Sequence, residues 1–325
     1  MKKTIWLLLD NRIGSKNQAL GIAHYLDENK FNIIIKNIEY NKLASLPNFI
    51  RQNTLLGITK SSKELLKSPF PDFVLSSTRR TAPVARYIKK QNPATKLFQL
   101  IHIGRSGLND FELVFVPEHD KHKIKSNNIR YTVGAPHFIT QEKLDDAKQK
   151  WQNKFSHLPR PITALIVGGA IKKHPFSIEN AKKLALAVKK LKEKEGGSLL
   201  ITTSRRTGLD AQNEIMSILG DFPNYNYLWG SKDENPYLGF LSCSDNIVVT
   251  GDSVSMCCEA TATHKPLRIF TATDWLTPKH LSFVKSLYDY GYAQNIENEH
   301  FSTTHLKSNL NVAKDIAEII SNLCH

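Results

Sequence analysis

The sequence predicts an α/β protein built from two doubly wound parallel-sheet domains. Three observations lead to this prediction. Short apolar runs alternate with helix-like or turn segments along the 325-residue chain, a pattern typical of parallel sheets covered by helices on both faces. A proline-rich passage, H-L-P-R-P-I at 157–162, interrupts the alternation near its middle. The length suits two domains of about 150 residues each.

The expected strands fall into two series separated by the proline-rich passage. The first strand, T-I-W-L-L-L, has an apolar core that ends at Asp10 and is too short for a secretion signal. The rest of the first series is expected in F-N-I-I-I-K-N-I, D-F-V-L-S-S, L-F-Q-L-I-H-I and F-E-L-V-F-V. The second series is expected in T-A-L-I-V-G-G, S-L-L-I-T-T-S, Y-N-Y-L-W, N-I-V-V-T and L-R-I-F, with a long helix at about 177–194.

The two series predict an N-terminal Rossmann-like domain over residues 1–156 and a C-terminal one over residues 157–325, facing each other across a cleft. A last helix, at about 306–323, could pack on either domain. No segment is long enough to span a bilayer.

The net charge of +14 and the pI near 9.5 suit an anionic partner. The basic residues are mostly lysines spread along helices, and no zinc finger, RNP-type aromatic motif or basic arm occurs, so nucleic acid is the lesser reading. Phosphorylated small molecules and an acidic membrane surface are the other partner classes. Four cysteines show neither metal spacing nor a disulfide framework, so we expect reduced thiols in a cytoplasmic protein.

The segment Val249–Phe270, V-T-G-D-S-V-S-M-C-C-E-A-T-A-T-H-K-P-L-R-I-F, predicts a strand, a turn, a helix and a further strand. The helix start offers free backbone N–H groups and a positive dipole, which together hold phosphate well. Glu259, farther along the helix, could accept hydrogen bonds from a ribose diol. Alternatively, Ser253 or Ser255 only caps the helix and Glu259 is a solvated surface charge.

A near-repeat places S/T-Arg-Arg-Thr just past one apolar run in each half of the chain. The two copies are V-L-S-S-T-R-R-T-A-P at 74–83 and L-I-T-T-S-R-R-T-G-L at 200–209. Ligands of open parallel sheets bind at the carboxyl ends of strands, and paired arginines there suit fork-like binding of phosphate or carboxylate. A structural ion pair or a solvent-facing arginine would explain one copy; the repetition favours anion binding.

Other turns carry weaker signals. D-N-R-I-G-S-K-N-Q-A-L-G at 10–21 puts Asn17 and Gln18 at an expected helix start, but it matches a dinucleotide fingerprint poorly. Gly168 and Gly169 follow a strand and either allow close backbone approach to a ligand or form a plain tight turn. Two basic residues lie nearby, Lys172 and Lys173.

V-F-V-P-E-H-D at 114–120 ends a strand with His119 and Asp120 together. A histidine beside a carboxylate at a strand end is a reasonable general base, and surface polarity accounts for the pair equally well. E-N-P-Y at 234–237, which includes Asn235, either frames a base or is only a proline-initiated helix. The chain has no Asp-x-Asp and no histidine cluster with ligand spacing, so we expect no catalytic metal and no cofactor.

Several long motifs together resemble the elongated-mitochondria family, which joins plant mitochondrial fission factors to bacterial proteins described as glycosyltransferases of the lipopolysaccharide outer core. The motifs are D-N-R-x-G-x-x-N-Q-A-L-G, S-S-T-R-R-T-A-P-V-A-R, D-F-E-L-V-F-V-P-E-H-D, G-S-L-L-I-T-T-S-R-R-T, E-N-P-Y and V-V-T-G-D-S-V-S-M-C-C-E-A. The resemblance runs from about Trp6 to about Asn295. The turn from Asp10 to Gly14 reads D-N-R-I-G where relatives are expected to read D-G-R-P-G, so the resemblance does not fix the geometry of this acceptor-side loop.

The resemblance implies a GT-B architecture, in which the second of two Rossmann-like domains holds most of the donor. The spacing from Glu259 to Pro266 looks like the donor-site helix of GT-B enzymes such as the lipid-II N-acetylglucosaminyltransferase. In those enzymes a glutamate at this place binds ribose and the helix start binds diphosphate. They need no bound metal, because the helix dipole and basic side chains neutralise the leaving diphosphate.

On this interpretation the chain is a metal-independent glycosyltransferase that moves a sugar from a nucleotide-diphosphate sugar to a lipid-linked or saccharide acceptor of lipopolysaccharide-core type, in the cytoplasm or peripherally at the inner membrane. The expected donor-binding residues are Gly168, Gly169, Lys173, Ser204, Arg205, Arg206, Asn235, Gly251, Asp252, Ser253, Val254, Ser255 and Glu259. The expected acceptor-binding residues are Asn17, Gln18, Thr78, Arg79 and Arg80, with His119 or Asp120 as the base if the reaction inverts. Two alternatives remain: a non-catalytic adaptor, as the fission role of the plant relatives suggests, and a GT-B nucleotide-sugar epimerase.

Overall fold

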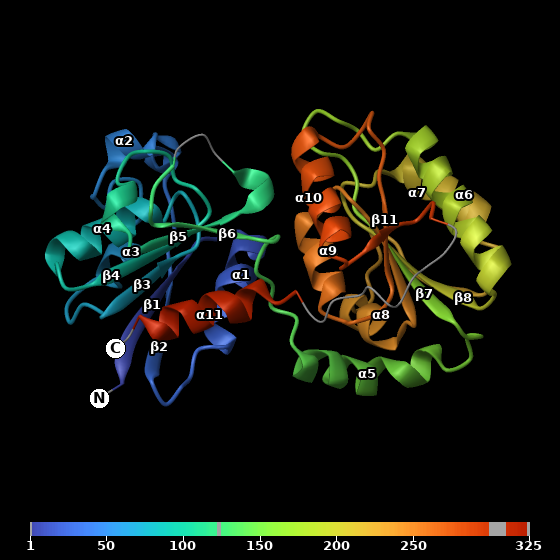
Figure 1. Cartoon of the computed structure of the whole chain (residues 1–325), viewed down its shortest axis with the longest axis horizontal. Helices are drawn as coiled ribbons and strands as arrows, with labels where there is room; N and C mark the ends of the chain where they lie inside the picture. The colour runs from blue at the N-terminus through green and yellow to red at the C-terminus, as the bar shows by residue number, and fades with distance from the viewer. Residues whose placement is uncertain (1, 122–124, 299–309, 324–325) are drawn as a thin grey trace. The chain divides into compact units, whose positions relative to one another are not determined.

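The computed structural model describes residues 2–121, 125–298 and 310–323. The chain forms two compact units, one made of Met1–Phe138 with Asn311–His325 and the other of Ile139–Leu310. Each unit contains a six-stranded parallel sheet covered by helices (Figure 1). The predicted fold class, two α/β parallel-sheet domains, is confirmed.

The first unit has the strand order β2-β1-β3-β4-β5-β6. Its strands are β1 (Lys3–Leu9), β2 (Phe31–Asn37), β3 (Phe73–Ser76), β4 (Lys96–Leu100), β5 (Leu113–Pro117) and β6 (Ile129–Thr132). Its helices are α1 (Ile13–His24), α2 (Asn48–Arg51), α3 (Lys60–Glu64), α4 (Ala82–Gln91) and α11 (Val312–Asn322), with the short 3-10 helices η1 (Lys42–Ser45), η2 (Leu108–Asp110) and η3 (Glu118–Asp120). The sequence predicted β1 to β5 but not the edge strand β6, which has no continuous apolar run.

Alternation along the strands sends side chains of this sheet to two faces. Trp6 and Leu8 of β1 pack in one buried cluster with Val84 and Ile88 of α4. The intervening residues of β1 are also buried and face the opposite side. On that side α1 and α11 pack against each other. Both faces are therefore covered, as the unbroken apolar runs predicted.

The second unit has the strand order β12-β11-β10-β7-β8-β9, which is the Rossmann order when β7 is counted as the first strand. Its strands are β7 (Ile162–Val167), β8 (Ser198–Thr203), β9 (Asn224–Tyr227), β10 (Asn246–Thr250), β11 (Leu267–Phe270) and β12 (Gln294–Asn295). Its helices are α5 (Gln141–Phe155), α6 (Ile178–Glu195), α7 (Leu209–Leu219), α8 (Tyr237–Cys243), α9 (Val254–Thr261) and α10 (Pro278–Asp289). The short polar edge strand β12 was not predicted.

Helices cover both faces of the second sheet as well. Leu165 and Val167 of β7 belong to a buried cluster with Leu184 of α6 and Ile215 of α7. The residues between them face α8 and α9 on the other side, and Figure 1 shows the two helix pairs on opposite sides of this sheet. Ser177 caps α6 by accepting the amide of Asn180 at 3.1 Å, in agreement with the helix predicted at about 177–194.

The units divide after Phe138, not at the predicted boundary of 156/157. The reason is α5, whose Trp151 and Phe155 stack on each other and whose Phe155 contacts Phe240 of α8 edge-on, so this helix belongs to the second core. The proline-rich passage predicted as a linker connects α5 to β7 inside that unit.

The final helix returns to the first unit. Nδ2 of Asn311, the N-cap of α11, donates to the hydroxyl of Tyr25 at 2.8 Å, and Nζ of Lys96 donates to the carbonyl of Leu323 at 3.1 Å. The sequence left open which domain this helix packs on, and in the structure it packs on the first unit. The first part of the expected helix, 306–309, lies outside the described residues.

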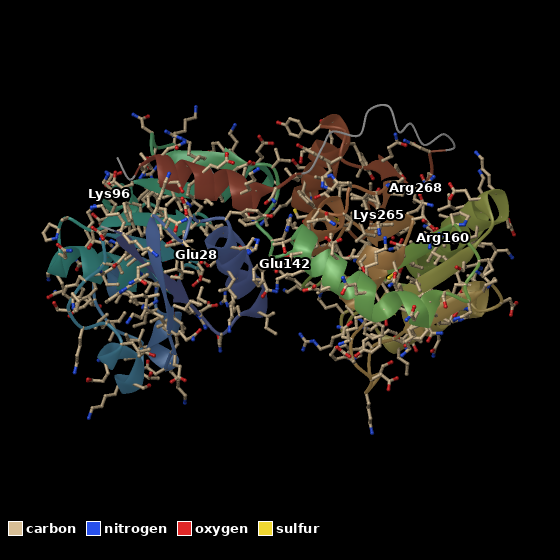
Figure 2. The ribbon with its side chains drawn as sticks, turned by 90° about the horizontal axis from the view of Figure 1, so that it is seen from below. Glu28, Lys96, Glu142, Arg160, Lys265 and Arg268 are labelled. Carbon is tan, nitrogen blue, oxygen red and sulfur yellow. The ribbon has the colours of Figure 1, made fainter. Side chains whose placement is uncertain are left out.

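Basic side chains fix the amino ends of strands in the second sheet. Asp245, which precedes β10, binds the guanidinium of Arg160, which lies just before β7. Nζ of Lys265 donates to the carbonyls of Leu241 at 2.6 Å and Ser242 at 2.8 Å, near the end of α8. Figure 2 labels Arg160 and Lys265 in this unit. Burial lowers the pKa of Lys265 to about 8.

Candidate functional site

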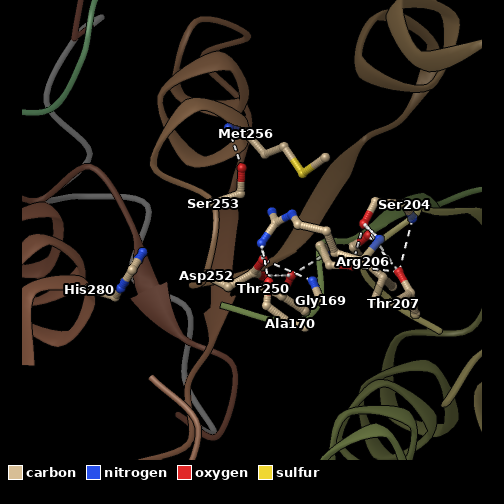
Figure 3. A network of polar contacts seen from close by, with 12 residues as sticks. Gly169, Ala170, Ser204, Arg206, Thr207, Thr250, Asp252, Ser253, Met256 and His280 are labelled. Atoms are coloured by element: carbon tan, nitrogen blue, oxygen red, sulfur yellow. Dashed lines mark hydrogen bonds and ion pairs between the residues drawn. The ribbon is translucent and has the colours of Figure 1, made fainter. Parts of the chain in front are cut away.

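The strand order of the second sheet reverses between β7 and β10, and ligands of open α/β sheets bind at such a switch point. Gly168 and Gly169 follow β7, while Gly251 and Asp252 follow β10. A direct hydrogen bond joins the two strand ends, because the amide of Gly168 donates to Oγ1 of Thr250 at 2.7 Å. Figure 3 shows the polar network that forms there.

Asp252 is the centre of this network and is only 4% exposed. Oδ1 accepts the hydroxyl of Thr250 at 2.7 Å, and Oδ2 accepts the amide of Gly169 and Nη1 of Arg206, each at 2.8 Å (Figure 3). Burial raises the pKa of Asp252, while the Thr250 bond, Arg206 and the Gly169 amide oppose the rise. Its donors all come from the protein itself. Asp252 thus fixes the loops around the site. The sequence analysis placed Asp252 among the donor-binding residues and did not predict this structural role.

The two glycines after β7 are required by the packing of these loops. A Cβ at Gly168 would lie 2.2 Å from Oδ1 of Asp252. Gly169 has a φ of +152°, and a Cβ there would lie 2.0 Å from the carbonyl carbon of Arg206. The close approach predicted at these glycines is thus made by the protein's own groups, and the amide of Gly169 is already used by Asp252.

The turn between β8 and α7 carries the second copy of the repeat. The amide of Ser204 donates to Oγ1 of Thr207 at 2.9 Å, and the amide of Arg206 donates to Oγ of Ser204 at 3.1 Å. The hydroxyl of Ser204 donates to the carbonyl of Gly168 at 2.6 Å, which ties this turn to the one after β7. The predicted hydroxyl groups therefore shape the turn.

The two arginines of this turn differ in what they leave available. Nη1 of Arg206 forms an ion pair with Asp252 and donates to the carbonyl of Ala170 at 2.9 Å. The structural ion pair that the sequence analysis considered is therefore present at this nitrogen. Its Nε and Nη2 have no partner among the described residues. Arg205 is exposed and has no partner in the described part of the chain, and the same holds for Lys173.

Helix α9 begins at Val254, two residues after Asp252. Ser253 is its N-cap and accepts the amide of Met256 at 3.4 Å (Figure 3), so the capping role considered from sequence is correct. Helix geometry leaves the amides of Val254 and Ser255 without an acceptor inside the helix. No described side chain accepts a hydrogen bond from either amide. Since the amide of Gly251 bonds to the strand next to it, two amides and the positive helix end remain for an anion.

Glu259 of α9 has a partner that the sequence analysis did not single out. The hydroxyl of Tyr237 donates to Oε2 of Glu259 at 2.6 Å. Burial raises the pKa of Glu259, and the bond from Tyr237 opposes that rise; burial and the nearby carboxylate raise the pKa of Tyr237 in turn. Glu259 is therefore a partly buried carboxylate and not a solvated surface charge. Oδ1 of Asn235 accepts the amide of Tyr237 at 3.0 Å, and Pro236 is the N-cap of α8, which agrees with the alternative of a proline-initiated helix for E-N-P-Y.

The first copy of the repeat follows β3 and has the same turn geometry. The amide of Thr78 donates to Oγ1 of Thr81 at 2.9 Å, and the amide of Arg80 donates to Oγ1 of Thr78 at 3.2 Å. Thr78 is buried and its hydroxyl is used by the turn. The side chain of Arg79, like that of Arg205, is exposed and has no partner among the described residues. Since β1 and β3 flank the switch point of the first sheet, this copy lies at the ligand edge of its unit.

The other residues predicted for the first unit are less closely gathered. Asn17 and Gln18 are half-buried in the second turn of α1, which begins at Ile13, so their prediction at the helix start is wrong. His119 and Asp120 are half-buried in η3 at the end of β5. No group of three or more histidine, cysteine or acidic side chains suited to a metal ion occurs among the described residues.

Comparisons with known proteins identify the family of the chain. The family described as Mitochondrial fission ELM1 matches residues 13–323. A relative named Uncharacterized protein RP120, from Rickettsia prowazekii, is 30% identical, and the match covers 97% of each chain. The protein named Mitochondrial fission protein ELM1, from Arabidopsis thaliana, is 28% identical over 74% of this chain and 60% of its own length.

Two solved structures show the fold class. The UDP-GlcNAc 2-epimerase from Methanocaldococcus jannaschii is 14% identical with a TM-score of 0.59, covering 98% of this chain and 99% of its own. A glycosyltransferase from Rickettsia africae is 15% identical with a TM-score of 0.51, covering 99% and 88%. The predicted GT-B architecture of two Rossmann-like domains is confirmed, and by its sequence the chain belongs to the mitochondrial fission ELM1 family.

Proposed function

We propose that the protein is a metal-independent glycosyltransferase that takes its sugar from a nucleotide-diphosphate donor. One observation carries the proposal. The amides of Val254 and Ser255 open at the switch point of a Rossmann sheet with no described side chain bonded to them, and the turn bearing Arg205 is tied to the same loops. The names of the structurally similar proteins, a UDP-GlcNAc 2-epimerase and a glycosyltransferase, support a nucleotide-sugar ligand.

The donor diphosphate would lie against these two amides, with Arg205 and the free Nε and Nη2 of Arg206 as its charged partners and Lys173 at the rim. Glu259 would accept hydrogen bonds from the ribose. As the glycosidic bond breaks, negative charge grows on the leaving diphosphate, and preorganised amides and guanidinium groups stabilise that charge directly. Removing one such donor typically lowers the rate by on the order of 100-fold.

The first unit would bind the acceptor. The exposed Arg79 and the half-buried Arg80 would orient it, and His119 or Asp120 would take the proton of its hydroxyl if the reaction inverts. We infer an acceptor of lipopolysaccharide-core type from the family resemblance, and a site of action at the cytoplasmic face of the inner membrane. Among the described residues, no helix is both long and apolar enough to cross a bilayer.

The test is a melting-shift screen with UDP, GDP, ADP and CMP, and with the nucleotide sugars of each. We expect one nucleotide diphosphate to raise the melting temperature. Arg205→Ala should weaken its affinity by about 10- to 100-fold, because a charged hydrogen bond is lost. Lys182→Ala, which removes an exposed cation from α6, is the matched control and should bind normally. The proposal fails if no nucleotide shifts the melting curve.

Two alternative functions, a nucleotide-sugar epimerase and a non-catalytic adaptor, are each supported by one of the comparisons. The likeness to a UDP-GlcNAc 2-epimerase favours an epimerase as the second candidate, since that reaction uses the same donor. Release of free nucleotide that depends on added acceptor indicates transfer, and acceptor-independent conversion of the sugar indicates epimerisation. The family's mitochondrial fission description favours an adaptor, which is the better account if no nucleotide binds.

The charge of the chain motivates a separate proposal about location. A net charge of +14 would attract the protein to an anionic bilayer surface. Liposomes containing an anionic lipid should bind it, and binding should weaken between about 0.05 and 0.5 M salt because the attraction is screened. Equal binding to neutral liposomes would contradict an electrostatic attachment.

A further inference from the structure

The buried polar atoms of the first unit that have no hydrogen-bond partner among the described residues include Oδ2 of Asp10, the hydroxyl of Tyr40 and Nη2 of Arg51. Asp10 is 3% exposed and Arg51 is fully buried. Such groups are few in native proteins, and each one needs a physical explanation. None of these residues belongs to the set predicted from sequence.

The fold brings the three residues to the ligand edge of the first sheet. Asp10 directly follows β1, beside the switch point, and Tyr40 follows β2. Arg51 ends α2, and its Nη1 donates to the carbonyl of Arg80 at 3.2 Å, so it is attached to the arginine turn after β3. The guanidinium groups of Arg51 and Arg80 lie 6.0 and 5.7 Å from the ring centroid of Tyr40.

Electrostatics agree with this gathering. Burial raises the pKa of Tyr40, the charge of Asp10 raises it further, and Arg51, Arg80 and Arg12 lower it. The phenol therefore lies within the fields of one carboxylate and three guanidinium groups. Arg12 is the most exposed of these, at 56% of its side chain, and its Nε is 3.7 Å from Oδ2 of Asp10, too far for a hydrogen bond.

A purely structural role does not account for Arg51. Its Nε and Nη1 donate to the carbonyls of Leu56 and Arg80, which are neutral, and no described carboxylate pairs with it. Burying a guanidinium without a counter-ion is unfavourable, as burial's lowering of the pKa of Arg51 indicates. A buried guanidinium without a counter-ion, beside a phenol and a carboxylate oxygen that have no hydrogen-bond partner, is typical of a site that is completed by a ligand.

We propose that Asp10, Tyr40 and Arg51 form, with the arginine turn, a subsite for a saccharide that carries an anionic group. The carboxylate of Asp10 accepts a sugar hydroxyl, while Tyr40 and Arg51 donate to the phosphate or carboxylate of the same sugar, with Arg12 moving aside. The inference rests on the proposed function in one respect: it makes the acceptor an anionic saccharide. It concerns only the first unit, so it can fail separately.

The experiment compares two tyrosine-to-phenylalanine variants. Tyr40→Phe removes a hydroxyl without a partner, so the ligand-free protein should melt at the same temperature or slightly higher. Tyr25→Phe is the matched control, because the hydroxyl of Tyr25 accepts a hydrogen bond from Asn311, and its loss should lower the melting temperature by about 2–4 °C.

Binding is then measured by calorimetry with glucose 6-phosphate, glucuronic acid, glucose and inorganic phosphate, each with and without saturating UDP. We expect one anionic sugar to bind at least 10-fold more tightly than glucose or phosphate. The preferred sugar also shows whether phosphate or carboxylate is the recognised anion. Tyr40→Phe and Asp10→Asn should each weaken that binding by about 10-fold or more, and Tyr25→Phe should not.

The outcomes separate this inference from the proposed function. If Tyr40→Phe destabilises the protein as Tyr25→Phe does, its hydroxyl has a structural partner and the inference is wrong. It is also wrong if nucleotides bind while no anionic sugar binds better than glucose, and the glycosyltransferase proposal then stands alone. If an anionic sugar binds through Tyr40 but no nucleotide binds, the subsite stands and the transferase proposal falls.

Discussion

Replacing Glu259 by glutamine distinguishes the effect of its carboxylate on the stability of the fold from its role in binding a nucleotide. The carboxylate is partly buried, it has no cationic partner among the described residues, and its one hydrogen bond comes from Tyr237 at 2.6 Å. Burial raises the pKa of Glu259 above its ordinary value of 4.5, so the folded state holds this proton more tightly than the unfolded chain. The stabilisation that follows is present at low pH and is lost as pH rises, so at pH 7 the ionised group destabilises the fold.

Glu259→Gln keeps an oxygen for Tyr237 but removes the charge. We therefore expect no loss of stability at pH 7 in urea unfolding. A hydrogen bond between a ribose hydroxyl and a charged acceptor contributes about 1.5–3 kcal/mol, so the affinity for the nucleotide should fall by about 10- to 100-fold. The affinity of the wild-type protein should also fall as pH drops through the raised pKa of Glu259, whereas the variant should show no such dependence.

Calorimetric titration of the nucleotide from pH 7.5 downward measures both effects. Glu179→Gln, which neutralises an exposed glutamate on α6, is the matched control and should behave as wild type. Equal nucleotide affinity in Glu259→Gln and wild type at pH 7 would remove Glu259 from the ribose site. A large loss of stability would mean that the carboxylate is a structural element, and the reasoning from its burial would be wrong.

Three further predictions concern the network and the sheet edge. Asp252→Ala should lower the free energy of unfolding by about 2–4 kcal/mol, because it leaves the Gly169 amide and one nitrogen of Arg206 without their acceptor; urea unfolding checks this, and a loss below about 1 kcal/mol would contradict it. Gly169→Ala should destabilise by more than about 2 kcal/mol, since its Cβ would meet the backbone of Arg206, whereas Gly14→Ala, with nothing within 4 Å, should be neutral or stabilising; equal melting temperatures would refute the argument. The pKa of Lys265 is lowered from 10.5 to about 8, so between these two pH values the unfolded chain binds more protons than the folded protein. The contribution of Lys265 to the free energy of unfolding should therefore increase as the pH rises from 8 to 10.5. Urea unfolding midpoints at pH 7.5 and pH 10 should show an increase in the wild type that is smaller in Lys265→Met.

Much of the fold was accessible from the sequence. The strands β1 to β5 and β7 to β11 were predicted from apolar or aromatic runs bounded by turns. The segment from β10 through α9 to β11 was predicted with Ser253 or Ser255 as the helix cap, and the structure has Ser253. The strands β6 and β12 were missed, because each is short and has no run of apolar residues. The unit boundary was misplaced because α5 joins the second core through contacts with α8 that are distant in sequence.

The candidate site was only partly accessible. The repeat at 74–83 and 200–209 correctly marked two turns of equal geometry at the ends of β3 and β8. The sequence did not distinguish Arg205, which is exposed, from Arg206, which is bound to Asp252. It also passed over Tyr237, although that residue stands in a motif that was noticed.

The sequence by itself determined the alternation of strands and helices, the caps and the hydroxyl-rich turns, since each depends on side chains a few residues apart. The tertiary structure alone decided which polar groups meet. Asp252 reaches Gly169 and Arg206 because the Rossmann order makes β10 the neighbour of β7. Asp10, Tyr40 and Arg51 gather because β1, β2 and α2 end at one edge of the first sheet. Strand order decides which polar groups that are distant in sequence come close enough to form hydrogen bonds and ion pairs, and strand order follows from how the apolar faces pack.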